Sequence, residues 1–255
     1  MKAKPALPCR LRADPHDHEV DMTVTPELSL IRKYSTATRP ALHSLNVQLS
    51  QCAERGRVIN PMGRLDRIVL QSQSTLPYYH NYSPGTSAAT LAVVVVHGIK
   101  RNADDYFRSI VRAAVDLDVT QRALVIAPCF QIEGDTRKAS DAYWTDSGPS
   151  SWKDGGDAVK PAGLSSFQVM DKILTTLADK HQFPQLARVS LVGHSAGGQF
   201  IHRYAACGRA PKTSPGMPVS YVTANPSSYL YLSPHRPVEK ANFDYVHSIT
   251  TTNTD

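Results

Sequence analysis

The feature of this 255-residue chain that most constrains its fold is a continuous run of apolar, largely β-branched residues, Leu91–Val96. An apolar side chain at every position suits a strand that is buried on both faces, as in the centre of a parallel sheet. Further runs at Arg122–Ala127, Val189–Val192 and Pro218–Ala224 predict companion strands. Segments with apolar residues at helical spacing separate these runs. The alternation predicts an α/β protein, a three-layer α/β/α sandwich with a mostly parallel sheet.

Three helices are expected between these strands. Asn102 is placed to cap the first, and Ser165 with Gln168 has the spacing of a capping box for the second. The third follows the run at 189–192. Between the first two helices lies the aperiodic stretch Gln131–Gly163, and a loop of this length inside a compact domain is usually functional or disordered.

Aromatic residues in this long stretch leave two interpretations open. Tyr143, Trp144 and Trp152 are expected at the carboxyl ends of the strands, where open α/β sheets place ligands, and would there line an aromatic groove. Alternatively, they pack the loop onto the domain. No metal ion is expected, because the acids of the stretch lack the spacing of a calcium-binding loop and no histidine accompanies them.

One large α/β domain fits the length of the chain. Residues 1–60 are expected to form a disordered or poorly defined segment, residues 61–235 the α/β domain, and residues 236–255 an irregular tail. Two more strands, at Arg67–Gln71 and Leu76–Tyr82, are expected near the start of the domain.

Charge, cysteine spacing and hydropathy exclude several functional classes. The net charge of +6 comes mainly from residues 1–67, and no basic stripe with interleaved aromatics is visible, so no nucleic-acid partner is expected. The four cysteines are far apart without CxxC spacing, which indicates neither a zinc site nor a disulfide framework. No apolar stretch reaches the roughly 18 residues of a membrane span. We expect a cytoplasmic protein without cofactor, and its oligomeric state cannot be derived from the sequence.

The segment Gly193–Gly198, Gly-His-Ser-Ala-Gly-Gly, carries the strongest functional signal. It follows a predicted strand and precedes a predicted helix, which is the context of a nucleophile elbow. A serine hydroxyl is a weak nucleophile in water, so an enzyme must present it to a base and to substrate on a sharp turn. Gly193 and Gly197 suit this turn, because side chains two residues either side of Ser195 would have no room. Ser195 is the predicted nucleophile.

Two backbone amides are expected to stabilise the oxyanion that forms when a serine attacks an ester. One belongs to Ala196, at the N-terminus of the helix after Ser195. The other belongs to Ile99, after the central strand, where Gly98 lets the backbone approach closely. His97 is expected to brace this loop by a hydrogen bond rather than to transfer protons.

Together these features resemble the α/β-hydrolase superfamily. The resemblance covers residues 65–232 and rests on the strand that ends in His97-Gly98, the helix after it, and the Gly-x-Ser-x-Gly motif. Segments such as Ala224–Tyr229 are similar to the sequences of a little-characterised branch of predicted hydrolases within this superfamily. The resemblance implies an α/β-hydrolase-like fold and a serine hydrolase, without a particular substrate.

The sequence departs from the family pattern after Ser195. In α/β-hydrolases an acid and then a histidine follow the serine, on loops after later strands. Because only one strand is predicted after Ser195, the sequence suggests a truncated member whose C-terminal strands, with the usual acid and histidine, are missing.

Few histidines qualify as the catalytic base. His202 would lie about 10 Å along the helix from Ser195, beyond hydrogen-bond reach. His194 is expected to diverge from the hydroxyl on so tight a turn. His247 lies three positions after Asp244, and this is the family's order of acid and then histidine. His247 is therefore kept as the candidate base.

Two functions remain open. The first is a serine hydrolase of esterase or lipase type that acts on a small-molecule carboxylic ester through an acyl-enzyme. The second is a non-catalytic protein that binds a ligand or partner on an α/β-hydrolase scaffold. An activated serine separates the two, because only the first requires one.

Overall fold

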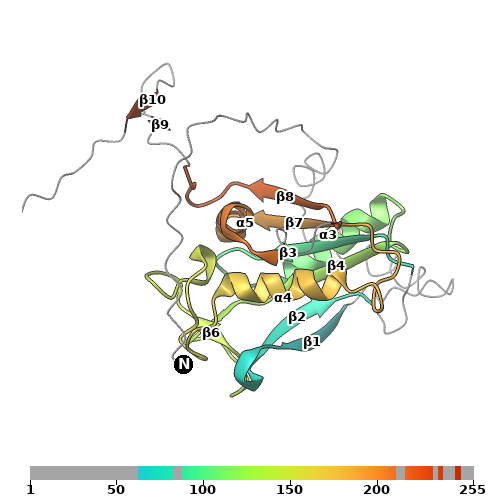
Figure 1. Cartoon of the computed structure of the whole chain (residues 1–255), viewed down its shortest axis with the longest axis horizontal. Helices are drawn as coiled ribbons and strands as arrows, with labels where there is room; N and C mark the ends of the chain where they lie inside the picture. The colour runs from blue at the N-terminus through green and yellow to red at the C-terminus, as the bar shows by residue number, and fades with distance from the viewer. Residues whose placement is uncertain (1–62, 83–87, 211–215, 232–234, 238–244, 248–255) are drawn as a thin grey trace, which may run out of the picture. The chain divides into compact units, whose positions relative to one another are not determined.

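The fold is that of a computed structural model, which describes residues 63–82, 88–210, 216–231, 235–237 and 245–247 (Figure 1). Contacts between Cα atoms divide the chain into one unit of Thr23–Ser227 and another of Met1–Met22 with Ser228–Asp255. The predicted domain limits at residues 60 and 235 stay predictions, because most residues outside those limits are not among the described ones.

The second unit contains two short strands, which lie in the predicted irregular tail except for His235, the last residue of the predicted domain. They are β9 (His235–Pro237) and β10 (Tyr245–His247), and they pair antiparallel. Three-residue strands carry too little periodicity to be recognised in a sequence.

The larger unit is built on a six-stranded sheet with the order β1-β2-β4-β3-β7-β8. Its strands are β1 (Arg64–Val69), β2 (Thr75–His80), β3 (Leu91–Val96), β4 (Ala123–Pro128), β7 (Arg188–His194) and β8 (Val219–Ala224). Strands β3, β4, β7 and β8 run parallel, whereas β1 pairs antiparallel with β2 and β2 with β4. The prediction of a mostly parallel α/β sheet is confirmed.

Helices cover both faces of the sheet (Figure 1). Helix α3 (Ala103–Asp116) packs Phe107 and Val111 against Val95 and its neighbours on one face. Helices α4 (Ser166–Ala178) and α5 (Ala196–Cys207) pack on the other face, where Phe200 belongs to the same core cluster as Val96. Alternate residues of β3 thus enter opposite cores, which explains its unbroken apolar sequence. Among the described residues, no helix is long and apolar enough to span a membrane.

Strand order makes the carboxyl end of β3 a topological switch point of the sheet. The chain passes from β3 through α3 to β4 on one side, then returns through α4 to β7 on the other side. Open α/β sheets bind ligands at such a switch point, outside the carboxyl ends of the two diverging strands. The ends of β3 and β7 therefore define the place where a site is expected.

The long stretch after β4 is ordered by its own short elements, β5 (Gln131–Ile132), β6 (Tyr143–Trp144) and the 3-10 helix η2 (Trp152–Asp154). The side chains of Trp144 and Trp152 are fully buried, and Trp152 stacks on Phe130 with ring centroids 5.7 Å apart. The alternative of an aromatic groove is wrong for these two indoles. They join the core, because burying such large apolar surfaces is more favourable than leaving them in an open groove.

The two predicted helix caps have different outcomes. Ser165 forms the predicted capping box with Gln168, whose side chain accepts a hydrogen bond from the Ser165 amide at 2.7 Å. Asn102 precedes α3 but makes no side-chain cap. Asn102 thus occupies the predicted N-cap position, and its side-chain amide donates to the Asp105 carboxylate at 2.8 Å.

Candidate active site

Ser195 lies between the last residue of β7 and the first residue of α5. Its backbone has φ 57° and ψ −122°, a combination that non-glycine residues rarely adopt and that is frequent at functional sites. The Ser195 amide donates to the Ala224 carbonyl at 3.0 Å, and the Ser195 carbonyl accepts from the Gln199 amide at 2.9 Å. The residue is half-buried, and its side chain does not cap α5. The strained turn is therefore held by neighbouring backbone.

Close backbone contacts account for the glycines around Ser195. An alanine Cβ at position 193 would lie 2.2 Å from the Gly197 carbonyl oxygen, and one at position 197 would lie 2.2 Å from the Val96 carbonyl oxygen. At position 198 the Ala224 carbonyl oxygen would be 2.6 Å away. Since real Cβ atoms do not approach so closely, the turn requires these glycines, as the sequence suggests for Gly193 and Gly197.

The loop after β3 packs against this turn. Val96 is in register with Gly193, and the same Cβ at position 197 would lie 2.6 Å from the His97 carbonyl oxygen. A Cβ at Gly98 would lie 3.8 Å from the His194 carbonyl oxygen. The structure thus brings together the loop that holds Gly98 and the turn that holds Ser195, although they are about a hundred residues apart in sequence.

Both predicted oxyanion donors belong to these two segments. Ala196 is buried as the first residue of α5, where helix amides are oriented outward and carry partial positive charge. Ile99 lies in the turn after β3, with 43% of its surface exposed. Within the described residues, neither amide N–H donates to another protein group.

His97 holds the loop from inside the core. It is fully buried, its Nε2 accepts from the Phe130 amide at 2.9 Å, and its Nδ1 lies 2.9 Å from the Gly98 carbonyl oxygen. Because Nε2 accepts, the proton is on Nδ1 and is donated to Gly98. Burial lowers the pKa of His97 from 6.5 to about 4, so the ring is neutral near pH 7. These contacts agree with the bracing role expected from the sequence.

An ion cluster beside the loop is not apparent from the sequence. Arg101 Nε donates to Asp135 at 2.7 Å, and Arg101 Nη1 contacts Asp146 at 3.1 Å. The same Nη1 donates to the Ile99 carbonyl oxygen at 2.7 Å. The acids lie in the aperiodic stretch, 34 and 45 residues beyond Arg101, and no motif spacing connects them.

The described histidines near the turn do not engage the serine. His194 Nδ1 lies 3.3 Å from the Tyr106 hydroxyl on α3, and His202 is in the second turn of α5. Within the described ranges, the Ser195 hydroxyl makes no hydrogen bond to a histidine. His247 is described only as a backbone position in β10 of the other unit, and Asp244 lies outside the described residues. The base proposed from the sequence therefore stays a prediction.

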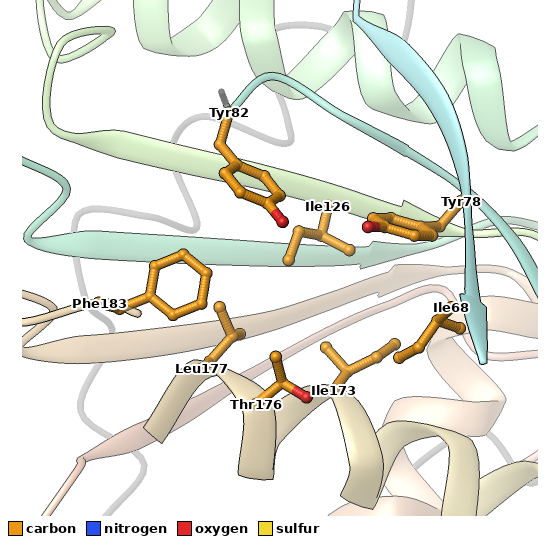
Figure 2. A pocket seen from close by; sticks show the side chains of 8 residues that line it. All are labelled: Ile68, Tyr78, Tyr82, Ile126, Ile173, Thr176, Leu177 and Phe183. Atoms are coloured by element: carbon orange, nitrogen blue, oxygen red, sulfur yellow. The ribbon is translucent and has the colours of Figure 1, made fainter. Parts of the chain in front are cut away.

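A cavity of about 50 Å³ lies away from these residues, between α4 and the β1-β2 side of the sheet (Figure 2). Figure 2 shows Tyr78, Tyr82 and Phe183 around it, with Ile173 and Leu177 contributed by α4. Burial and the neighbouring Tyr82 raise the pKa of the Tyr78 hydroxyl, which stays neutral. No candidate catalytic residue lines this cavity, so it is not part of the site.

No protein-family model and no curated protein matches the chain. Solved structures similar to it include a poly(3-hydroxybutyrate) depolymerase from Bordetella parapertussis, with 22% identity over 58% of this chain and 48% of that chain and a TM-score of 0.40. An esterase from Pyrococcus furiosus has 14% identity over 64% of this chain and 49% of that chain, with a TM-score of 0.38. A siderophore hydrolase from Aspergillus nidulans has 17% identity over 65% of this chain and 57% of that chain, with a TM-score of 0.36. The chain thus matches about half the length of these structures.

Proposed function

We propose that the protein is a serine hydrolase of esterase or lipase type. Ser195 attacks the carbonyl carbon of a carboxylic ester, the alcohol leaves with the serine proton, and water then releases the acid from the acyl-enzyme. The observation that supports this most is the strained Ser195 backbone, φ 57°, at the junction of β7 and α5. Strain of this kind persists only where surrounding contacts enforce it. The turn also lies at the switch point of the sheet, where open α/β folds bind ligands.

In the proposed reaction, the amide N–H groups of Ala196 and Ile99 donate hydrogen bonds to the oxyanion that forms on the carbonyl oxygen of the ester. Backbone donors need no reorganisation during the reaction, and loss of one such donor costs about 3–4 kcal/mol of transition-state stabilisation in well-studied hydrolases. Gly98 contributes by its position, since an alanine Cβ there would lie 2.7 Å from the Tyr106 hydroxyl. With glycine at this position, the loop after β3 can stay close to the Ser195 turn.

The attack also requires that the Ser195 proton be removed. His247 is proposed for this step from the order of acid and histidine in the sequence. Without a working base, an oxyanion site and substrate binding still accelerate hydrolysis by about 10³ to 10⁴ over water. Turnover near that level would identify the base as the missing element.

The second candidate function is a protein that binds a ligand on the same scaffold without catalysis. Such a protein would leave Ser195 unactivated.

A fluorophosphonate probe tests the proposal, because it reacts covalently with activated serines. We expect labelling of the native chain, no labelling of Ser195→Ala, and unchanged labelling of Ser109→Ala, which alters an exposed serine on α3. Absence of labelling in the native chain would favour the binding protein. Labelling that persists in Ser195→Ala would place the reactive group elsewhere and refute the assignment.

A further inference from the structure

We propose that Arg101 is a positioning residue that fixes the direction of the Ile99 amide in the oxyanion site. The inference rests on the proposed function and adds a residue to it. Arg101 donates from its side chain to the Ile99 carbonyl at 2.7 Å and from its backbone amide to the Gly98 carbonyl at 3.0 Å. It therefore contacts both peptide units that flank the Ile99 Cα atom.

The geometry of the peptide bond connects these contacts to the Ile99 N–H. The Gly98 carbonyl and the Ile99 N–H belong to one planar trans peptide, so they point in opposite directions. The Gly98 oxygen accepts from His97 Nδ1 at 2.9 Å and from the Arg101 amide. Two donors on the carbonyl side thus determine where the N–H points, and it has no acceptor within the described residues.

The conformation of Arg101 itself is part of this arrangement. Its amide closes the turn that begins at Gly98, and its own φ is 55°, in the left-handed region that an arginine seldom adopts. A residue persists in that region when its surroundings hold it there. The contacts of the guanidinium group supply this constraint.

Two carboxylates hold the guanidinium, and each is anchored elsewhere. Asp135 Oδ2 accepts from Arg101 Nε at 2.7 Å and from the Ile132 amide at 2.8 Å. Asp146 accepts from Arg101 Nη1 and from the buried Trp152 indole N–H at 3.2 Å. The long stretch after β4 is thereby connected to the oxyanion loop through Arg101.

This role predicts a selective kinetic effect. An oxyanion donor acts mainly on the transition state, so a misdirected Ile99 amide lowers the rate of the covalent step more than it weakens the initial binding. We expect Arg101→Gln to lower the maximal rate of fluorophosphonate labelling about tenfold, less than the loss of a whole donor. The probe concentration that gives half the maximal rate should stay within about twofold of the native value.

Two variants control this experiment. Arg101→Lys keeps the charge but not the forked geometry, so its labelling rate should fall between those of the native chain and Arg101→Gln. Arg108→Gln removes an arginine paired with Asp104 and Asp105 on the exposed side of α3, and should label at the native rate. An unchanged maximal rate in Arg101→Gln, or a change confined to the half-maximal probe concentration, would overturn the proposal.

Amide hydrogen exchange separates failure of this inference from failure of the proposed function. In Arg101→Gln the amide at position 101, which is bonded to the Gly98 carbonyl in the native chain, should exchange about tenfold faster, while β4 keeps its protection. If the native chain is not labelled at all, the proposed function has failed and the catalytic part of the inference fails with it. Unchanged exchange at position 101 would show in addition that Arg101 does not order the loop.

Discussion

Replacing Gly197 with alanine is expected to destabilise the protein by about 3 kcal/mol or more, beyond the usual range for overpacking by a methyl group. Helix propensity argues for the opposite sign, because alanine is favoured over glycine inside a helix by about 1 kcal/mol. Steric repulsion is the larger effect here. The new Cβ would lie 2.2 Å from the Val96 carbonyl oxygen, and a backbone atom of the central strand cannot move aside as a side chain can.

Urea unfolding at neutral pH measures this effect. Gly134→Ala is the matched control, since no heavy atom lies within 4 Å of the Cβ position at Gly134 and its φ is not in the left-handed region. The free energy of unfolding of the control should lie within about 0.5 kcal/mol of the native value. A Gly197→Ala variant as stable as the control would mean that β3 and the Ser195 turn are not in the contact described above.

The second large effect is a loss of stability in acid that originates at His97. Burial lowers the pKa of His97 to about 4 in the folded chain, whereas the unfolded value is near 6.5. Arg101 also lowers this pKa, while the Gly98 hydrogen bond and the charges of Asp135 and Asp146 raise it. Between these two pH values the unfolded state binds the proton and the folded state does not. At about 1.4 kcal/mol per pH unit, protonation of His97 lowers the free energy of unfolding by about 3 kcal/mol as pH falls from 6.5 to 4. Above pH 6.5 it has no effect on the free energy of unfolding.

The free energy of unfolding, measured across this pH window, tests the assignment. In His97→Gln, where an amide oxygen can still accept from Phe130, the acid loss should shrink by about that amount, because the titrating group is gone. His181→Gln removes an exposed histidine and should retain the native pH dependence. An equal acid loss in His97→Gln and in the native chain would place the titrating group elsewhere.

Much of the fold could be predicted because the central strands are buried on both faces. Such strands need apolar residues throughout, and Leu91–Val96 and the later run that ends at Val192 show this directly. The order of strands could not be predicted in the same way, since pairing depends on contacts between segments far apart in the chain. The strand order reverses direction at β3, and this reversal marks the switch point of the sheet.

The part of the candidate site whose residues are close together in the sequence could be predicted. Gly193, Ser195 and Gly197 form one turn, so their spacing carries the steric requirement. The Arg101 cluster was not predictable, because its partners come from a stretch without periodicity and meet only in the folded chain. The burial of Trp144 and Trp152 could not be predicted either, since composition does not distinguish an indole in a groove from one in a core.

Ser195 is tested as the nucleophile by locating the acyl group after the protein is mixed with a nitrophenyl ester. The native chain is digested soon after mixing, and the modified residue is identified by mass spectrometry. We expect an acyl group on the Ser195 side chain of the native chain and no modified serine in Ser195→Ala. An acyl group on another residue of the native chain, with Ser195 unmodified, would contradict this expectation.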